Sequence, residues 1–299
     1  MLKIITKLRN IRLIIRNRVQ RYFSWLPDAV YLRILYYAET GELLHLEKPR
    51  TFNEKLQWLK LNDRKKIHTD MVDKYAVKNI VAGKIGKEYV IPTIGVWDRF
   101  DDIPIGSLPD KFVIKTTHGG GGNDVEVVKD KRKWDIEKAK KRFTEALKRS
   151  IWKNYREWPY KDIPRKIIIE EYIEDKSGDL MDYKIFCFNG TPKFLKVDFN
   201  RFIKHQANYY DLEWTILPFG EDICPPDFSH RINKPKNFDL MLNLAEKLSA
   251  GTKFLRVDLY NSNGKIYFGE MTFYPASGMG TFSPKEWDLK LGELLELKD

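Results

Sequence analysis

The chain has 299 residues, of which 42% are hydrophobic and 13% aromatic, a composition typical of a globular protein of roughly two domains and unlike that of a disordered chain. Lysine and arginine (53) outnumber aspartate and glutamate (42), but seven of the basic residues lie within residues 1–22, which contain no acidic residue. The rest of the chain is therefore nearly balanced in charge, which argues against a nucleic-acid-binding protein.

The numbers and spacing of cysteines and histidines, together with the hydropathy of the chain, argue against further classes of protein. Cys187 and Cys224 are too few for a disulfide framework, and the five histidines form no HExxH or similar pair, so neither a disulfide scaffold nor a zinc enzyme is predicted. No apolar run approaches the ~18 residues needed to span a bilayer, and arginines interrupt the apolar positions near the N-terminus. We therefore expect a cytoplasmic protein.

Residues 2–26 are predicted to form an amphipathic helix. Ile4, Leu8, Ile11, Ile15 and Val19 recur at helical spacing, and basic residues fill much of the rest. Such a helix can lie on an anionic lipid surface, so residues 1–26 are a candidate for peripheral contact with the inner face of the plasma membrane. An ordinary first helix packed on the body has the same pattern, and both interpretations stay open.

The remaining elements predict an α+β fold. Residues 27–60 are expected to be helical with a turn at 46–52, where Thr51 or Asn53 can cap a new helix. Hydrophobic patterning predicts further helices at 69–82, 135–150 and 238–250, and strands at 89–94, within 111–128, and at 166–173, 183–188, 193–199, 207–210, 253–260 and 265–272. This order favours antiparallel hairpins over alternating βα units.

A run of four glycines follows the segment FVIKTTH. The backbone amides of Gly119, Gly120, Gly121 and Gly122 can fold around a polyphosphate, and Lys115 places a positive charge just before them. The spacing is not that of a P-loop, and no long helix follows as in a dinucleotide-binding motif. A phosphate-binding flap between two strands remains, with a simple hairpin turn as the alternative.

Two strands near the C-terminal end carry charged residues among apolar ones. Arg256 and Asp258 share one face of the first strand, and Glu270 and Thr272 can face them from the second. Paired carboxylates beside a phosphate site are what magnesium requires. A salt-bridged surface hairpin, with the arginine neutralising both acids, is the alternative interpretation.

Two weaker signals accompany these motifs. The segment IIIEEYI reads as a buried strand that can serve as a hinge facing an adenine. Lys74, on the helix predicted from residue 69, is placed to reach a phosphate from the side opposite Lys115, although an Asp-Lys pair is more typical of a solvated helix start.

Taken in order, these segments resemble the ATP-grasp superfamily, and within it the TupA-like proteins of the teichuronopeptide-biosynthesis type. The supporting segments run from about residue 69 to 285, and FNEKLQWLK and DYKIFCFNGTPKF extend the likeness over nearly the whole chain after about residue 30. The segments that support the resemblance between about residues 69 and 285 are VDKYAVKNIV, FVIKTTHGGGGNDVEVV, IIIEEYI, MDYKIF, FLRVDLY and IYFGEMTFYPASGM.

The resemblance implies a site for ATP and Mg²⁺ between two α+β lobes. Lys74 and Lys115 look like the lysines that contact the phosphates, with His118 and the glycines as the flap. Asp258 and Glu270 match the magnesium ligands, and Arg256 the residue that steadies the transferring phosphoryl group. Further residues implied for the nucleotide are the hinge residues Glu170, Glu171, Tyr172 and Ile173, then Glu174 or Asp182 for the ribose, and Lys184.

Two departures from the superfamily pattern stand out. Thr272 occupies a position where an asparagine is common, and a hydroxyl is a poorer metal ligand, so the pattern leaves open whether one or two magnesium ions bind. Only about 60 residues precede the helix that carries Lys74, so the usual Rossmann-like first domain is reduced or absent. We expect a helical region at 1–60, a small lobe at 61–173 and a catalytic lobe at 174–299.

By the same resemblance, the protein is expected to be a carboxylate–amine ligase acting through an acyl phosphate. The implied substrates are an amino acid such as glutamate and a uronic acid or peptide of a cell-surface polysaccharide. Lys184, Lys193, Arg201 and Lys204 are candidates for holding an anionic acceptor. The alternatives are a glycosyltransferase, although the chain contains no Asp-x-Asp, and a non-catalytic protein that binds ATP or a polyanion.

Overall fold

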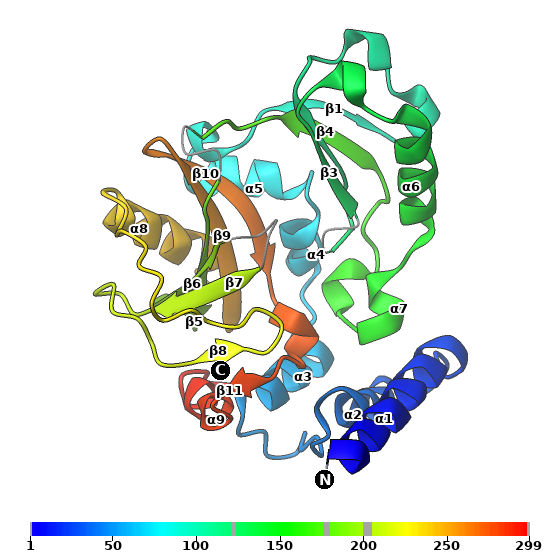
Figure 1. Ribbon diagram of the computed structural model, residues 1–299, viewed down its shortest axis with the longest axis vertical. Coiled ribbons are helices and arrows are strands. Elements are labelled where there is room, and N and C mark those ends of the chain that lie inside the picture. Colours follow the sequence, from blue (N-terminus) through cyan, green and yellow to red (C-terminus); the bar gives the residue numbers. More distant parts are fainter. Residues whose placement is uncertain (1, 121–123, 176–179, 200–204, 298–299) are drawn as a thin grey trace.

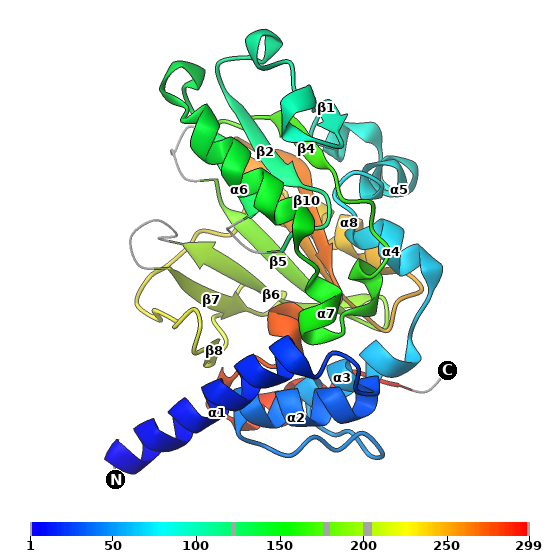
Figure 2. The same ribbon diagram turned by 90° about the vertical axis from the view of Figure 1, so that its right-hand side faces the viewer.

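A computed structural model describes residues 2–120, 124–175, 180–199 and 205–297 (Figure 1). Three helices come first: α1 (Leu2–Tyr22), α2 (Asp28–Thr40) and α3 (Phe52–Asn62). Helix α1 packs along α2, where Val19 is buried, and its N-terminal part extends beyond the body of the molecule (Figure 2). No helix in the described part of the chain is long and apolar enough to cross a membrane.

Helix α3 begins at the cap that the sequence predicts. The Thr51 hydroxyl accepts a hydrogen bond from the Glu54 amide (3.2 Å), and the Glu54 carboxylate accepts one from the Thr51 amide (3.1 Å), which together form a capping box. The cap is therefore Thr51, whereas Asn53 bonds to Asp288 of helix α9 (Glu286–Glu293).

The single helix predicted over residues 69–82 is wrong, because the chain forms two helices, α4 (Lys66–Val72) and α5 (Val77–Lys84). The Asp73 carboxylate accepts hydrogen bonds from the amides of Tyr75 (2.8 Å) and Ala76 (3.4 Å), and so competes with helical bonding. The Lys74 amide instead donates to the Thr117 carbonyl (3.0 Å). This break brings Lys74 beside the end of strand β2 (Phe112–Thr116).

A four-stranded antiparallel sheet has the order β1-β4-β2-β3. Its strands are β1 (Thr93–Trp97), β2 (Phe112–Thr116), β3 (Val125–Val128) and β4 (Ile167–Glu171). Helix α6 (Ile136–Lys148) covers one face, with Phe143 packed in one cluster with Phe112, Ile114 and Ile169 (Figure 2). Because side chains alternate along a strand, Val113 and Lys115 lie on the other face.

The strand predicted at residues 89–94 begins later, at Thr93. Pro92 has no amide hydrogen and cannot donate to a sheet, so pairing starts after it, while residues Lys87–Tyr89 form a 3₁₀ turn. The Pro92 carbonyl still accepts a hydrogen bond from the Glu171 amide (3.1 Å).

A five-stranded antiparallel sheet has the order β10-β9-β5-β6-β7, and each strand predicted in this half of the chain is present. Its strands are β5 (Asp182–Phe188), β6 (Thr191–Phe199), β7 (Gln206–Tyr210), β9 (Phe254–Ser262) and β10 (Lys265–Thr272). Helix α8 (Phe238–Ser249) covers the apolar face, where Met241 and Leu244 join the cluster that contains Ile185, Leu195 and Val257 (Figure 1).

The other face of the five-stranded sheet is charged. The β-sheet register aligns one residue from each strand into a row across it, with Lys184 directly opposite both Asp258 and Lys196. The complete row is Glu270, Asp258, Lys184, Lys196 and Tyr209.

A β-bulge at Gly269 determines the face of the sheet on which the side chains at the end of strand β10 lie. The two-residue turn Asn263–Gly264, with positive φ at both residues (52° and 85°), aligns Ser262 with Lys265 and Leu259 with Phe268. The extra residue then shifts the register, so that Glu270 pairs with Asp258. Without it, Glu270 would pair with Val257 and point to the apolar face.

The remaining elements connect these layers and were not predicted. Strands β8 (Gly220–Glu221) and β11 (Phe282–Ser283) pair with each other, and α9 packs against α3. Residues Met71, Val72, Val77 and Val81 of α4 and α5 share the hydrophobic cluster of the large sheet, although they precede the small sheet in the chain. The other helices are α7 (Ile151–Tyr155) and the 3₁₀ turns Phe100–Asp102, Ile105–Ser107, Lys131–Lys133, Trp158–Tyr160 and Pro275–Gly278.

Candidate nucleotide and metal site

A cavity of about 280 Å³ is lined by residues of both sheets. The small sheet contributes the face that alternation turns away from α6, including Val113 and Lys115, and the large sheet contributes strands β9 and β10. The segment that follows β4 closes one side. The full lining is Lys74, Ile91, Val113, Lys115, Val125, Val127, Lys129, Glu170, Glu171, Tyr172, Ile173, Leu180, Tyr260, Gly269 and Glu270.

Lysines gather on the side of the cavity formed by the small sheet. The Glu170 carboxylate accepts from Lys115 Nζ through one oxygen and from Lys78 Nζ through the other, each at 2.5 Å. Burial opposes ionisation of Glu170, but the charges of Lys115 and Lys78 lower its pKa. Lys74 Nζ donates to the carbonyl of Gly119. The glycine run is thus held directly to one of the lysines that the sequence selected.

Charged groups face the cavity from the hairpin β9–β10. The Arg256 guanidinium donates to both oxygens of Asp258 (2.7 Å each), to Glu270 (2.8 Å) and to the Thr272 hydroxyl (3.0 Å). The four residues predicted to share a face therefore do so. Burial raises the pKa of Asp258 to about 7. Although burial also acts on Glu270, the charges of Arg256 and Lys74 lower the pKa of that group to about 2.

Beyond Asp258, the charged row continues away from the cavity. Lys184 Nζ donates to Asp182 and to Asp198 (2.9 Å) and lies 3.7 Å from Asp258. Lys196 Nζ in turn donates to Glu221 (2.6 Å). All six of these side chains are buried, so their charges act through a medium of low polarity and are held in fixed positions.

Several of the predicted nucleotide residues do not line this cavity. The His118 ring is buried with Nε2 3.2 Å from the Ala146 carbonyl, toward α6. Glu174 is exposed and pairs with Lys111 (3.0 Å). Lys184 lies further along the charged row, and Asp182, two residues earlier on β5, pairs with it.

The other predicted residues fall into three groups. Lys74, Lys115, Glu170, Glu171, Tyr172, Ile173 and Glu270 line the cavity. Gly119 bonds to Lys74, Gly120 follows it, and Asp258, Arg256 and Thr272 adjoin Glu270. Gly121, Gly122, Arg201 and Lys204 lie outside the described residues.

Sequence reasoning missed Lys78, Lys129, Tyr260, Gly269 and Lys196. Lys78 follows Lys74 by four residues in VDKYAVKNIV, but Lys74 lies in the break between α4 and α5, so this spacing does not place the two side chains on one helical face. Gly269 is signalled only weakly, as a glycine inside a strand pattern. The positions of Lys129, Tyr260 and Lys196 depend on the pairing of strands distant in sequence.

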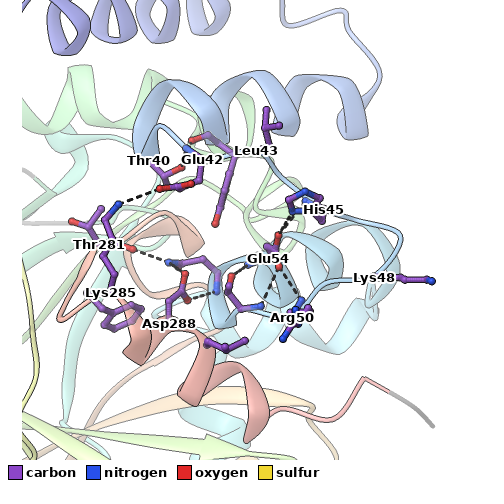
Figure 3. A pocket seen from close by; sticks show the side chains of 16 residues that line it. Thr40, Glu42, Leu43, His45, Lys48, Arg50, Glu54, Thr281, Lys285 and Asp288 are labelled. Carbon is purple, nitrogen blue, oxygen red and sulfur yellow. Dashed lines mark hydrogen bonds and ion pairs between the residues drawn. The ribbon is translucent and has the colours of Figure 1, made fainter. Parts of the chain in front are cut away.

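A larger cavity, of about 750 Å³, lies between the end of α2, the start of α3 and the segment Phe282–Ser283 with α9 (Figure 3). Its charged side chains already hold these elements together. Glu54 accepts from His45 (2.7 Å) as well as completing the α3 cap, and Lys285 pairs with Glu42 (3.1 Å). Asp288 accepts from the Asn53 amide (2.9 Å). We therefore place the chemistry in the smaller cavity.

An α+β protein with two antiparallel sheets that line one lysine-rich, carboxylate-flanked cavity has the architecture of the ATP-grasp class. The sequence of the chain matches the model of the TupA-like ATP-grasp family over residues 54–296. The chain therefore belongs to this family, and the fold is the ATP-grasp fold preceded by a helical segment.

Three solved structures similar to the chain are distant from it in sequence. A D-alanine–D-alanine ligase from Bacillus anthracis has 18% identity and a TM-score of 0.38, covering 70% of this chain and 58% of that one. D-alanyl-alanine synthetase A from Vibrio cholerae has 12% identity and a TM-score of 0.42, covering 70% and 57%. The ATP-grasp ligase PsnB, complexed with a phosphomimetic variant of its minimal precursor, Mg and ADP, has 9% identity and a TM-score of 0.41, covering 80% and 63%.

The chain thus spans less than two thirds of the length of each of these three structures. No curated protein matches its sequence.

Proposed function

We propose that the protein is an ATP-dependent carboxylate–amine ligase. A carboxylate oxygen of the first substrate attacks the γ-phosphorus of ATP, which releases ADP and leaves an acyl phosphate. The amine nitrogen of the second substrate attacks the acyl carbon, loses a proton and expels phosphate, so that an amide forms. The observation that carries this proposal is one cavity with lysines on the wall formed by the small sheet and, on the facing wall, Glu270, which pairs across β9–β10 with Asp258.

The chain's own residues have separate roles in this scheme. Lys74 and Lys115 bind the phosphates as fixed positive charges, and the hinge segment from Glu171 to Ile173 takes the adenosine end. Arg256 orients the transferring phosphoryl group, since a guanidinium forms bidentate bonds to its oxygens. No nucleophilic side chain is needed, because the reaction requires stabilisation of charge on oxygen atoms.

The donor set at Asp258 and Glu270 fits magnesium. The buried Asp258 carboxylate and the part-exposed Glu270 carboxylate, opposite each other on β9 and β10, would supply hard oxygen ligands to the ion, together with oxygens of the substrate phosphates. When bound, Mg²⁺ neutralises phosphate charge. Arg256 now contacts both carboxylates, so it has to release them, at least in part, when the ion binds.

For the substrates, we propose an amino acid such as glutamate and a uronic acid or peptide in cell-surface polysaccharide biosynthesis. The family likeness supports this choice. Lys193, an exposed residue of β6, supplies positive charge for an anionic acceptor, whereas Lys184 and Lys196 are buried and already paired with acidic side chains.

Oxygen transfer tests the proposed reaction. The purified chain is incubated with ATP, Mg²⁺ and candidate acid–amine pairs, with ¹⁸O in the acid's carboxylate. The proposed mechanism predicts ADP release together with one ¹⁸O atom in the phosphate. ADP release without ¹⁸O transfer contradicts the acyl phosphate. Tight ATP binding without turnover for any pair favours a non-catalytic protein, for which the arginine-bridged acids and Thr272 are the supporting observations.

We also propose that helix α1 contacts an anionic membrane. Ile11, Leu13 and Ile14 are exposed along the helix, and Tyr22 and Trp25 are exposed at its end, among arginines that complement an anionic surface. Deletion of residues 1–25 is expected to reduce sedimentation with vesicles rich in phosphatidylserine. Equal sedimentation of the full chain and the shortened chain would show that α1 is only a packing helix.

A further inference from the structure

A second cluster of metal-ligating side chains lies beyond Lys184 on the charged face of the large sheet. Asp198 is near the end of β6, His205 directly precedes β7, and Cys224 follows β8. One ligand atom from each side chain lies within 4.8 Å of the other two. His205 Nε2 is 3.6 Å from Asp198 Oδ2 and 3.7 Å from Cys224 Sγ.

These separations match the edges of a tetrahedral zinc site. With bonds of about 2.1 Å from zinc to nitrogen or oxygen and about 2.3 Å to sulfur, the nitrogen lies about 3.4 Å from the oxygen and about 3.6 Å from the sulfur. The observed distances are close to both values.

We propose that Asp198, His205 and Cys224 bind a Zn²⁺ ion whose fourth position is open to water or a substrate atom. Thiolate and imidazole ligands select zinc over magnesium, which takes hard oxygen ligands. The carboxylate and the thiolate supply two negative charges to the ion, in surroundings that also hold the ammonium groups of Lys184 (2.9 Å from Asp198 Oδ2) and Lys196 (3.9 Å from Asp198 Oδ1). His205 is exposed (42% for its side chain), which leaves an entry path, while Asp198 and Cys224 are buried.

The surroundings hold these ligands in position. Lys184 Nζ donates to Asp198 Oδ2 (2.9 Å), as expected of an outer partner to a ligating carboxylate. Asp198 is paired with Asp182 on β5 and with Ala207 on β7. The Cys224 amide donates to the Glu221 carbonyl (3.1 Å). The ligands are dispersed along the chain and brought together by the fold, which explains why the sequence predicted no zinc site.

Cobalt substitution tests the site independently of any ligase activity. The full chain is stripped of metal with a chelator and titrated with Co²⁺ alone, then with Zn²⁺. We expect one Co²⁺ per chain, near-ultraviolet sulfur-to-cobalt charge-transfer absorption, and displacement by Zn²⁺. We also expect Zn²⁺ to raise the midpoint of thermal unfolding, because it binds the native state. Absence of the charge-transfer band in the wild type would overturn the proposal.

Variants identify the ligands. Cys224→Ser should abolish the band, and His205→Ala should weaken Co²⁺ affinity by more than the roughly 10–100-fold that loss of an outer partner costs. His205→Ala alters an exposed side chain, so it remains informative if Cys224→Ser folds poorly. The matched controls are Cys187→Ala, at the other cysteine, and His45→Ala, at an exposed histidine. A band that survives Cys224→Ser, or that is lost equally in Cys187→Ala, would contradict the site.

Discussion

Glu170 is buried between two lysines that come from different elements, Lys115 on β2 and Lys78 on α5. Burial opposes its charge, yet the lysines lower its pKa, so the native state binds a proton less readily than the unfolded chain. Its contribution to stability is therefore complete above the unfolded pKa of about 4.3 and is lost as the pH falls through the lower native value.

We accordingly expect Glu170→Gln to lower the free energy of unfolding by about 3 kcal/mol at pH 7, because two buried ammonium groups lose their partner. The difference from wild type should narrow at pH 3. Urea denaturation at both pH values measures it, with Glu171→Gln, the exposed neighbour on the same strand, as the control. A difference that is equal at pH 7 and pH 3 would show that the ion pairs are not its source.

Single site residues could be predicted where local spacing carries the signal. Lys115 stands four residues before the first glycine, and Arg256 and Asp258 are two apart on one strand, which is enough to place them. The orientation of His118 could not be predicted, since the nearby carbonyl of Ala146 comes from a helix distant in sequence.

The hairpin β9–β10 shows the limit of prediction at the level of an element. Its turn at Asn263–Gly264 follows from sequence, but a regular hairpin with that turn would point Glu270 to the wrong face. The bulge at Gly269 corrects the facing, and the glycine inside the strand pattern KIYFGEMT is only a weak local signal of it. Similarly, the Thr51 cap is visible in TFNE, whereas the helix break at Asp73 depends on side-chain bonding within its own turn.

A substitution at Gly269 tests the role of this bulge. A Cβ atom there would lie 3.0 Å from the Asp258 carbonyl oxygen and 3.2 Å from the Tyr260 ring, so the strands would have to shift. We expect Gly269→Ala to cost about 1–3 kcal/mol in the free energy of unfolding and to weaken ATP binding. Gly106→Ala, where a Cβ meets open space, is the control. Identical behaviour of the two variants would contradict the role of the bulge.

At the scale of the whole molecule, the α+β class and both sets of strands could be predicted, because hydrophobic alternation is local. The elements that join distant segments could not. Strands β8 and β11 are two residues each and pair across some sixty residues, and α9 is recognisable only by its contact with α3. The placement of α4 and α5 against the large sheet likewise depends on packing.

The central claim is that one cavity, lined by both sheets, holds the nucleotide. Calorimetric titration of ATP with Mg²⁺ into wild type, Lys115→Ala and the exposed-site control Lys133→Ala tests it most directly. Loss of one charged phosphate contact should weaken binding by about 10–100-fold in Lys115→Ala and leave Lys133→Ala unchanged. Wild-type affinity in a folded Lys115→Ala variant, or no ATP binding to the wild type, would contradict the claim.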